Sequence, residues 1–322
     1  MAGNLNVPPD QVFNKLLSDL GDHHGLVIGP YHLADLPFIF VKDGEFDVYF
    51  SHHALEESGK WTMSHPDHPH HPVLADSGAG PDLDLSITNF VFFQFLGMAI
   101  VLGIFAIVGA RYRKKPDKAP TGIQNAVEGL VTYIRDDVVR ANIPGRKLAD
   151  KLLPYFITNF LFILILNLFG LIPGGHVATS GIGTTTALAI IAFLVINVTA
   201  FRTAGAGHYF HHFLGGAPTF MAPIMIPVEI ISLFAKPFAL AVRLFANMTA
   251  GHVVLLSLVG LIFYFQTVVV SPVAVGFSVF VYFIELLVCF LQAYIFTILT
   301  AVFAGLAIGN HGDDHHAEGA HA

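Results

Sequence analysis

Residues 224–266 read IMIPVEIISLFAKPFALAVRLFANMTAGHVVLLSLVGLIFYFQ, an apolar stretch of about 40 residues with only three charged side chains. As one continuous helix it would be roughly 60 Å long, about twice the thickness of the hydrocarbon core of a bilayer. A second stretch of this kind covers residues 272–309. We therefore expect an all-α membrane protein whose last two helices are long and strongly tilted in the bilayer.

The composition of the whole chain agrees with a membrane protein. Hydrophobic residues make up 54% of the sequence and charged residues only 12%, whereas ordinary soluble domains are about 25% charged. Mean hydropathy is +0.65. Between residues 152 and 310 there are five charged side chains, so this part of the chain has too little polar surface to fold in water.

Three shorter apolar segments bring the expected number of membrane crossings to five, because each is long enough to cross a hydrocarbon core of about 30 Å. The five expected crossings are residues 87–110, 152–173, 184–201, 224–266 and 272–309. Residues 122–140 differ from these, since their apolar side chains fall on one face of a helix. This pattern predicts an amphipathic helix on the membrane surface.

The distribution of charge predicts the orientation and the domains. Between residues 111 and 151 there are ten basic and five acidic residues, and basic loops stay in the cytoplasm. We therefore expect residues 1–85 to be an extracytoplasmic, acidic and His-rich region. Residues 86–310 would form the membrane domain, and residues 311–322 a disordered tail that ends in the cytoplasm.

Within the N-terminal region, residues 26–50 predict a few short strands, and residues 52–81 have the composition of a linker. Four histidines of this linker are potential metal ligands, but alternating prolines keep the segment extended. We favour a solvated linker and expect no metal site here. The four histidines are His65, His68, His70 and His71.

Charged residues inside a membrane are costly and mark functional sites. Glu229, Lys236 and Arg243 are spaced seven residues apart, which places them near one face of a helix. Asn247 is one turn beyond Arg243. On the last helix, a second pair of polar residues, Glu285 and Gln292, has the same spacing.

Two antiparallel helices would bring some of these residues to the same depth. If Gln292 is level with Arg243 near the middle of the membrane, Glu285 lies about 10 Å toward the outside. His252 lies about 13 Å beyond Arg243 in the same direction. We therefore expect His252 and Glu285 together on the outer side and Glu229 on the cytoplasmic side.

This layout suits proton movement. His and Glu exchange protons when their environments tune them, whereas Arg does not release its proton. A proton would pass Arg243 only on a carboxylate carried by another molecule. A buried structural Glu–Arg network is the alternative explanation.

Several segments resemble subunit a of F-type ATP synthases. They are RLFANMTAGH at residues 243–252, Glu285 with LQAYIFTILT at residues 291–300, and NLFGLIP at residues 167–173. The resemblance implies a proton-channel subunit that works against a c-ring of small hairpin subunits. It also implies a peripheral-stalk subunit b as partner and a bacterial plasma membrane, with the mitochondrial inner membrane as alternative.

The resemblance also implies residue roles. Arg243 would be the stator arginine that faces the ring carboxylate, and Glu229 would belong to the cytoplasmic half-channel. His252 and Glu285 would form the outer half-channel. The polar residues that flank the arginine in the family correspond to Asn247 and Gln292.

The sequence leaves other functions open. No phosphate-binding loop is visible, so we expect no nucleotide site, no cofactor and no catalysis of ATP chemistry by this chain, and nothing suggests nucleic acid as a partner. A secondary transporter, with 18 His as potential ligands for a divalent metal, and a structural membrane scaffold are the competing hypotheses. The residue types alone also do not decide whether the transported ion is a proton or sodium.

Overall fold

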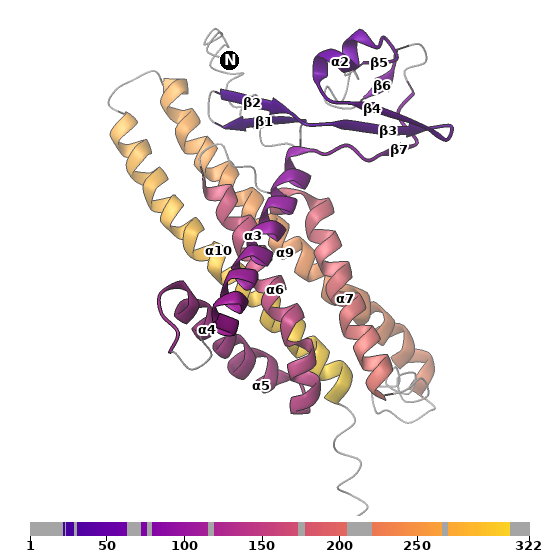
Figure 1. Cartoon of the computed structure of the whole chain (residues 1–322), viewed down its shortest axis with the longest axis vertical. Coiled ribbons are helices and arrows are strands. Elements are labelled where there is room, and N and C mark those ends of the chain that lie inside the picture. The colour runs from indigo at the N-terminus through magenta and orange to yellow at the C-terminus, as the bar shows by residue number, and fades with distance from the viewer. Residues whose placement is uncertain are drawn as a thin grey trace, which may run out of the picture. The chain divides into compact units, whose positions relative to one another are not determined.

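The structure is a computed structural model that describes residues 22, 24–28, 31–62, 72–75, 79–114, 119–172, 178–204, 221–265 and 270–309 (Figure 1). Among these residues, five helices are long and apolar enough to cross a membrane. They are α3 (Asn89–Lys114), α6 (Arg146–Leu171), α7 (Ile182–Ala204), α9 (Ala222–Phe265) and α10 (Val270–Gly309). The expected all-α membrane fold is confirmed, and the tilt of the last two helices stays a prediction.

The two longest apolar stretches each form one unbroken helix. α9 has 44 residues and α10 has 40. Pro227 and Pro237 each lack a backbone N–H donor, yet α9 runs through both. Neither stretch is therefore split into two short passes.

The chain divides into two compact units. The first unit comprises residues 1–97, 166–181 and 250–286. The second comprises residues 98–165, 182–249 and 287–322. The C-terminal tail expected at residues 311–322 and the histidines expected in a linker at residues 65–71 lie outside the described residues.

The first unit contains short antiparallel strands before α3. β1 (Gly25–Ile28) pairs with β2 (Tyr31–Asp35), and β3 (Phe38–Lys42) lies between β4 (Glu45–Tyr49) and β7 (Leu83–Asp84). Asp43 and Gly44 have φ of 50° and 84° and close the β3–β4 hairpin. A two-residue turn needs positive φ at both positions, which Asp-Gly adopts readily. Strands expected at residues 26–50 are therefore present.

The expected linker at residues 52–81 is partly wrong. It contains helix α2 (His52–Glu57), β5 (Trp61–Thr62) and β6 (Val73–Leu74), with β5 and β6 paired. Leu55 and Trp61 are fully buried against Phe38 and Phe40. Because two large apolar side chains supply this core, the segment folds in spite of its polar composition.

The expected amphipathic helix lies in the second unit. It consists of α4 (Ile123–Tyr133), a π-helical turn (Ile134–Val139) and α5 (Arg140–Asn142). Its buried apolar side chains are Ile134, Val138 and Val139. Tyr133 stacks on Tyr294 of α10, with ring centroids 6.1 Å apart. The amphipathic pattern thus packs one face of this helix against the bundle.

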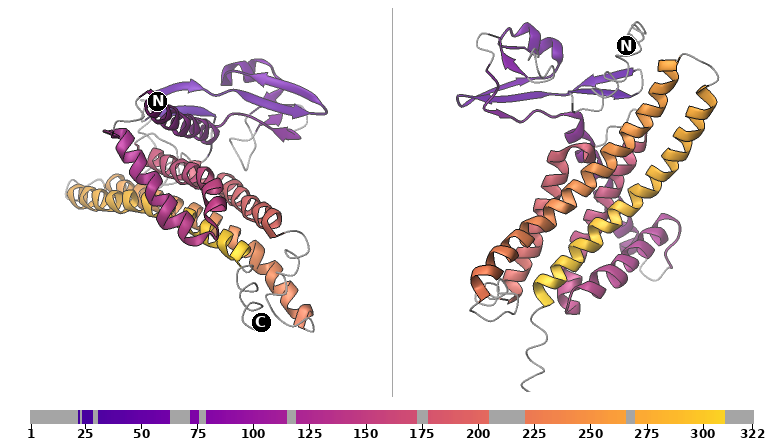
Figure 2. Two further views of the ribbon diagram at one scale, coloured as in Figure 1. Left: turned by 60° about the horizontal axis from the view of Figure 1, so that its bottom comes forward. Right: turned by 180° about the vertical axis from the view of Figure 1, so that it is seen from behind.

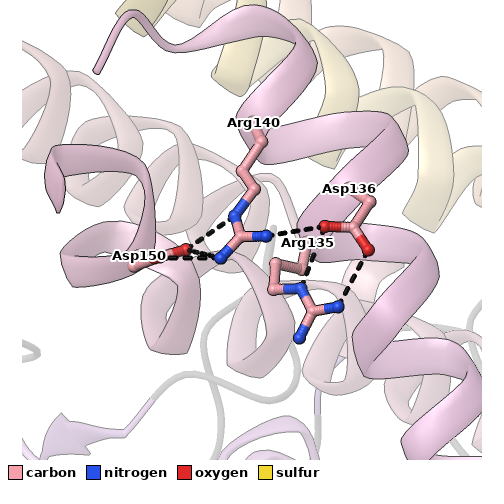
Figure 3. Close-up of polar contacts among 4 residues, drawn as sticks. All are labelled: Arg135, Asp136, Arg140 and Asp150. Carbon is pink, nitrogen blue, oxygen red and sulfur yellow. Dashed lines mark hydrogen bonds and ion pairs between the residues drawn. The ribbon is translucent and has the colours of Figure 1, made fainter. Parts of the chain in front are cut away.

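An ion-pair network joins this amphipathic segment to the start of α6 (Figure 3). Arg140 contacts Asp136 at 3.0 Å and Asp150 at 2.8 Å, and Arg135 contacts Asp136 at 2.8 Å. The hydrogen bonds from Arg135 lower the pKa of Asp136. A single exposed pair stabilises little, but one arginine shared by two carboxylates restricts the connection between the two helices.

Aromatic side chains connect helices within each unit, and Figure 2 draws these helices from two further directions. In the first unit, Phe93 of α3 lies 5.5 Å from Phe169 of α6, measured between ring centroids. In the second unit, Phe193 of α7 stacks on Phe234 of α9 at 5.9 Å. These contacts hold the helices that carry the polar residues of the membrane domain.

Candidate functional site

A histidine and a glutamate form a close pair in the first unit. His252 Nδ1 of α9 lies 2.7 Å from Glu285 Oε1 of α10, and their side chains are only 14% and 3% exposed. Apart from this contact, the carboxyl oxygens of Glu285 have no hydrogen-bond partner among the described residues. A carboxyl group in such an apolar site depends on the imidazole for its polar contact.

The second ring nitrogen of His252 defines the tautomer. Nε2 lies 3.0 Å from the backbone oxygen of Gly170, and a carbonyl oxygen only accepts hydrogen bonds. Nε2 must therefore carry a hydrogen and donate it. Nδ1 then shares one further proton with Glu285, either as imidazolium beside carboxylate or as imidazole beside carboxylic acid.

The partner carbonyl belongs to the C-terminal end of α6, which ends at Leu171. The last four carbonyls of a helix lack an intrahelical partner. His252 bonds the carbonyl of Gly170, and Tyr282 Oη of α10 donates to the carbonyl of Leu171 at 3.1 Å. Side chains of α9 and α10 thus cap α6 and fix the ring of His252 toward Glu285.

A glycine leaves room for this pair. A Cβ atom added at Gly251 would lie 2.7 Å from Glu285 Oε1, which is closer than a carbon and an oxygen approach without bonding. Any larger residue at this position would displace the carboxyl group. Gly251 is therefore part of the geometry of the pair, although it has no side chain of its own.

In the second unit, two amides connect the same two helices. Asn247 Nδ2 of α9 donates to Gln292 Oε1 of α10 at 2.8 Å, and Gln292 is 2% exposed. From the sequence we assumed that Gln292 is level with Arg243; its hydrogen-bond partner in the structure is Asn247, one turn further along α9. The register of two packed helices depends on how their side chains fit together, and the spacing of residues along one helix does not report this fit.

Arg243 has an unusual environment. It is exposed, as are Val242 beside it and Phe238 on the preceding turn. Within the part of the chain that the structure describes, no carboxylate forms an ion pair with Arg243. A guanidinium is always charged, and exposure to lipid would be costly. A polar or anionic group next to this surface would therefore stabilise the charge of Arg243.

A pocket in the second unit contains the remaining predicted charges. Glu229 and Lys236 of α9 line it together with Asn197 of α7 and Phe303 of α10. Lys236 Nζ lies 5.6 Å from the ring centroid of Phe303, within reach of a cation–π interaction. The rest of the lining is mainly apolar, so both charged residues of α9 line a space of low polarity.

The structure thus brings His252 into contact with Glu285 and Asn247 into contact with Gln292, and it places Glu229 and Lys236 in the lining of one pocket. Sequence reasoning did not identify the roles of Gly170, Tyr282 and Gly251 around the first pair. Gly170 acts through its backbone oxygen, and every residue type has one, so the sequence gives no signal for this role. For Gly251, its place next to His252 in an apolar helix was the available signal, because glycine weakens a helix unless close packing requires it.

Comparison with known proteins relates this chain to one family. Residues 91–305 match the family ATP synthase A chain. The chain is 48% identical over 236 residues to ATP synthase subunit a of Chloroherpeton thalassium, covering 72% of this chain and 70% of the relative. It is 44% identical over 272 residues to ATP synthase subunit a 2 of Prosthecochloris aestuarii, covering 84% and 81%.

Five membrane-length helices and several polar side chains along them define a multi-pass membrane protein. The match over residues 91–305 and the similarity to these relatives are both extensive. The chain belongs to the ATP synthase A chain family. It is a membrane component of the ATP synthase complex and takes part in proton transport for ATP synthesis.

Proposed function

We propose that this chain is the stator of the proton path, in which two offset half-channels lead to a ring of small hairpin subunits. The observation that carries the proposal is the exposed Arg243 on an apolar surface. A ring carboxylate that passes this surface would be attracted to the guanidinium and would release its proton there. Such a ring, and a stalk subunit b that holds the stator against it, are the partners we infer.

The outer half-channel ends at His252 and Glu285. The 2.7 Å contact between Nδ1 and Oε1 suits a pair that accepts a proton from one side and passes one on. Asn247 and Gln292 lie further along the same two helices in the direction of Arg243. Their amides offer both donors and acceptors for water or for a proton carrier.

The cytoplasmic half-channel is the pocket that Glu229 and Lys236 line. Glu229 accepts the proton that a ring carboxylate has released, and Lys236 stabilises the charge of Glu229. Arg243 lies between this pocket and the His252–Glu285 pair along α9, nine residues before His252. Because Arg243 keeps its proton, direct flow between the half-channels is blocked.

The orientation we infer puts residues 1–85 outside a bacterial plasma membrane and the basic residues after α3 in the cytoplasm. The membrane domain, residues 86–310, then crosses the bilayer five times. The bacterial relatives support this location.

Cross-linking in the assembled complex tests the ring partner. Ala239 and Ala246 are exposed on the face of Arg243, whereas Leu244 beside it is fully buried. An aliphatic diazirine residue at 239 or 246 should give, on illumination, an adduct with a small hairpin subunit, and the same residue at 244 should not. Adducts with lipid alone from positions 239 and 246 would contradict the proposal.

A further inference from the structure

The three-stranded sheet before α3 has one face without charge. Val41 of β3 pairs with Phe46 of β4 and with Leu83 of β7, and Ile39 pairs with Val48. Directly paired residues lie on the same face of a sheet. Phe50 and Leu85 continue the alternation of β4 and β7. The face, which we call the apolar sheet face, consists of Ile39, Val41, Phe46, Val48, Phe50, Leu83 and Leu85.

These side chains are largely uncovered. Phe46 is 71% exposed and Phe50 is 77% exposed. Val48, Leu83 and Leu85 are each about half exposed, at 47%, 54% and 49%. Scattered apolar residues on a surface need no explanation, but a contiguous apolar patch marks an interaction site.

The opposite face carries the charges and the core. Lys42 pairs with Glu45, and Phe40 pairs with Asp47 and Asp84. This face also contributes Phe38 and Phe40 to the core with Leu55 of α2 and Trp61 of β5. A sheet with one side in water normally exposes its polar face. Here the charged residues lie on the face that also packs the core, and the open face has none, so the open face is built for an apolar environment.

The sheet is connected to the first membrane helix by a very short link. β7 ends at Asp84 and α3 begins at Asn89. The four residues between them span at most about 14 Å. Leu85 N donates to Ile39 O at 2.9 Å and Ile87 N to Pro37 O at 3.0 Å, so the link itself is bonded to β3. The sheet cannot move far from the end of a membrane-spanning helix.

We propose that the apolar sheet face lies on the lipid bilayer, with Phe46 and Phe50 inserted at the boundary between headgroups and acyl chains. Because the sheet is connected directly to the membrane helix α3, a bilayer lies close to it. The absence of charge on this face suits an uncharged apolar partner. The sheet hydrogen bonds of β3 stay intact, so side chains enter the lipid without exposing the central backbone groups. Insertion of this kind reaches about 5–10 Å below the surface.

Fluorescence quenching in nanodiscs tests this contact with the full-length chain. Phe46→Cys and Phe50→Cys provide sites for an environment-sensitive dye, and Glu56→Cys on exposed α2 is the matched control. The single native cysteine, Cys289, is fully buried. The probes are phosphatidylcholine brominated near the top of its acyl chains and iodide in the water.

We expect bromine to quench the dye at 46 and 50 several times more strongly than at 56, and iodide to show the reverse order. Equal access of iodide to all three positions would overturn the proposal. Protection from iodide without quenching by bromine would also overturn it, because a second copy or another subunit would then cover the face.

A second variant does not depend on a dye at a phenylalanine position. With the dye at Val48→Cys, Phe46→Ser combined with Phe50→Ser should abolish quenching by brominated lipid. Both phenylalanines are exposed, so their loss leaves the core with Trp61 intact, and the fluorescence of Trp61 reports this. Unchanged bromine quenching in this variant would contradict insertion by the two phenylalanines.

Discussion

His252 Nδ1 lies 2.7 Å from Glu285 Oε1, while the opposite nitrogen of the same ring lies 3.0 Å from the carbonyl oxygen of Gly170. The backbone of α6 therefore decides which nitrogen faces the carboxyl group. The short distance between Nδ1 and Oε1 is that of a hydrogen bond between imidazole and carboxyl. The two residues are therefore expected to act as one functional unit.

The first prediction tests this unit. His252→Ala or Glu285→Ala should each greatly reduce ATP-driven proton pumping in inverted vesicles. The exchange of both residues, His252→Glu with Glu285→His, should restore part of the rate because a proton-sharing pair is rebuilt. Losses that simply add, with no recovery in the exchanged variant, would show that the contact has no role in transport.

The second prediction concerns the space beside the pair. Gly251→Ala would place a methyl group 2.7 Å from Glu285 Oε1 and should push the carboxyl group away from His252. We expect proton pumping to fall at least about tenfold, as misplacement of a reacting group by about 1 Å is costly. Gly276→Ala is the matched control, since nothing lies within 4 Å of its Cβ position. Equal rates in the two variants would refute the role of Gly251.

The third prediction concerns the stator arginine. Arg243→Ala should abolish both ATP synthesis and ATP-driven pumping, because no fixed cation would then attract the ring carboxylate. Arg243 is exposed and has no ion pair among the described residues, so the complex should still assemble. Arg202→Ala, which removes the same charge at the end of α7, should keep near-normal rates. Coupled synthesis in an assembled Arg243→Ala complex would disprove the mechanism.

Much of the membrane domain followed from the sequence. The length of the apolar stretches predicted five helices, and seven-residue spacings with antiparallel helices predicted that His252 and Glu285 lie together. The hydrogen bond from Asn247 to Gln292 was not predicted, because the level of Gln292 relative to α9 was only assumed. A spacing fixes a position along one helix, whereas the offset between two helices depends on packing across their contact.

The N-terminal region was harder to predict for a physical reason. β5, β6 and β7 have two residues each, which is too short for an alternating pattern to appear. Proline and histidine dominate the composition around Trp61, so the segment resembled a linker. Burial of Trp61 and Leu55 in one small core depends on contacts between distant residues, and local composition does not report such contacts.

The fourth prediction concerns acid stability of this N-terminal fold. Burial works to raise the pKa of Asp47, but hydrogen bonds from Lys60 and Trp61 outweigh it and lower the pKa. The lowered pKa stabilises the fold above the unfolded value of about 3.9, and this contribution is lost as pH falls through the folded pKa. Asp47→Asn should therefore weaken the pH dependence of unfolding below the unfolded pKa of about 3.9.

Trp61 is the only tryptophan in the chain, and its Nε1 lies 2.9 Å from Asp47 Oδ2. Its fluorescence therefore reports unfolding of this region directly, in the full-length protein in detergent. Glu56→Gln, an exposed carboxylate on α2, is the control. If Asp47→Asn and the unchanged chain lose the buried tryptophan signal over the same pH range, the Asp47 interaction does not stabilise the fold.

The fifth prediction separates the folded part of the N-terminal region from proton transport. Trp61 pairs with Leu74, and Thr62 with Val73, so β5 and β6 accept a short connection. Replacing residues 63–71 with Asn-Gly leaves a three-residue loop that contains glycine. We expect the pumping rate per assembled complex to stay unchanged.

Deleting residues 52–71 also removes Leu55 and Trp61 from the core. This variant should make the N-terminal region sensitive to protease, again with a normal rate per complex. Measurements in inverted vesicles, normalised to assembled complex, distinguish the two effects. A modest shift in pH dependence at constant maximal rate would indicate that the histidines gather protons near the outer half-channel. Loss of pumping in a fully assembled complex with the Asn-Gly connection would show that this segment belongs to the channel itself.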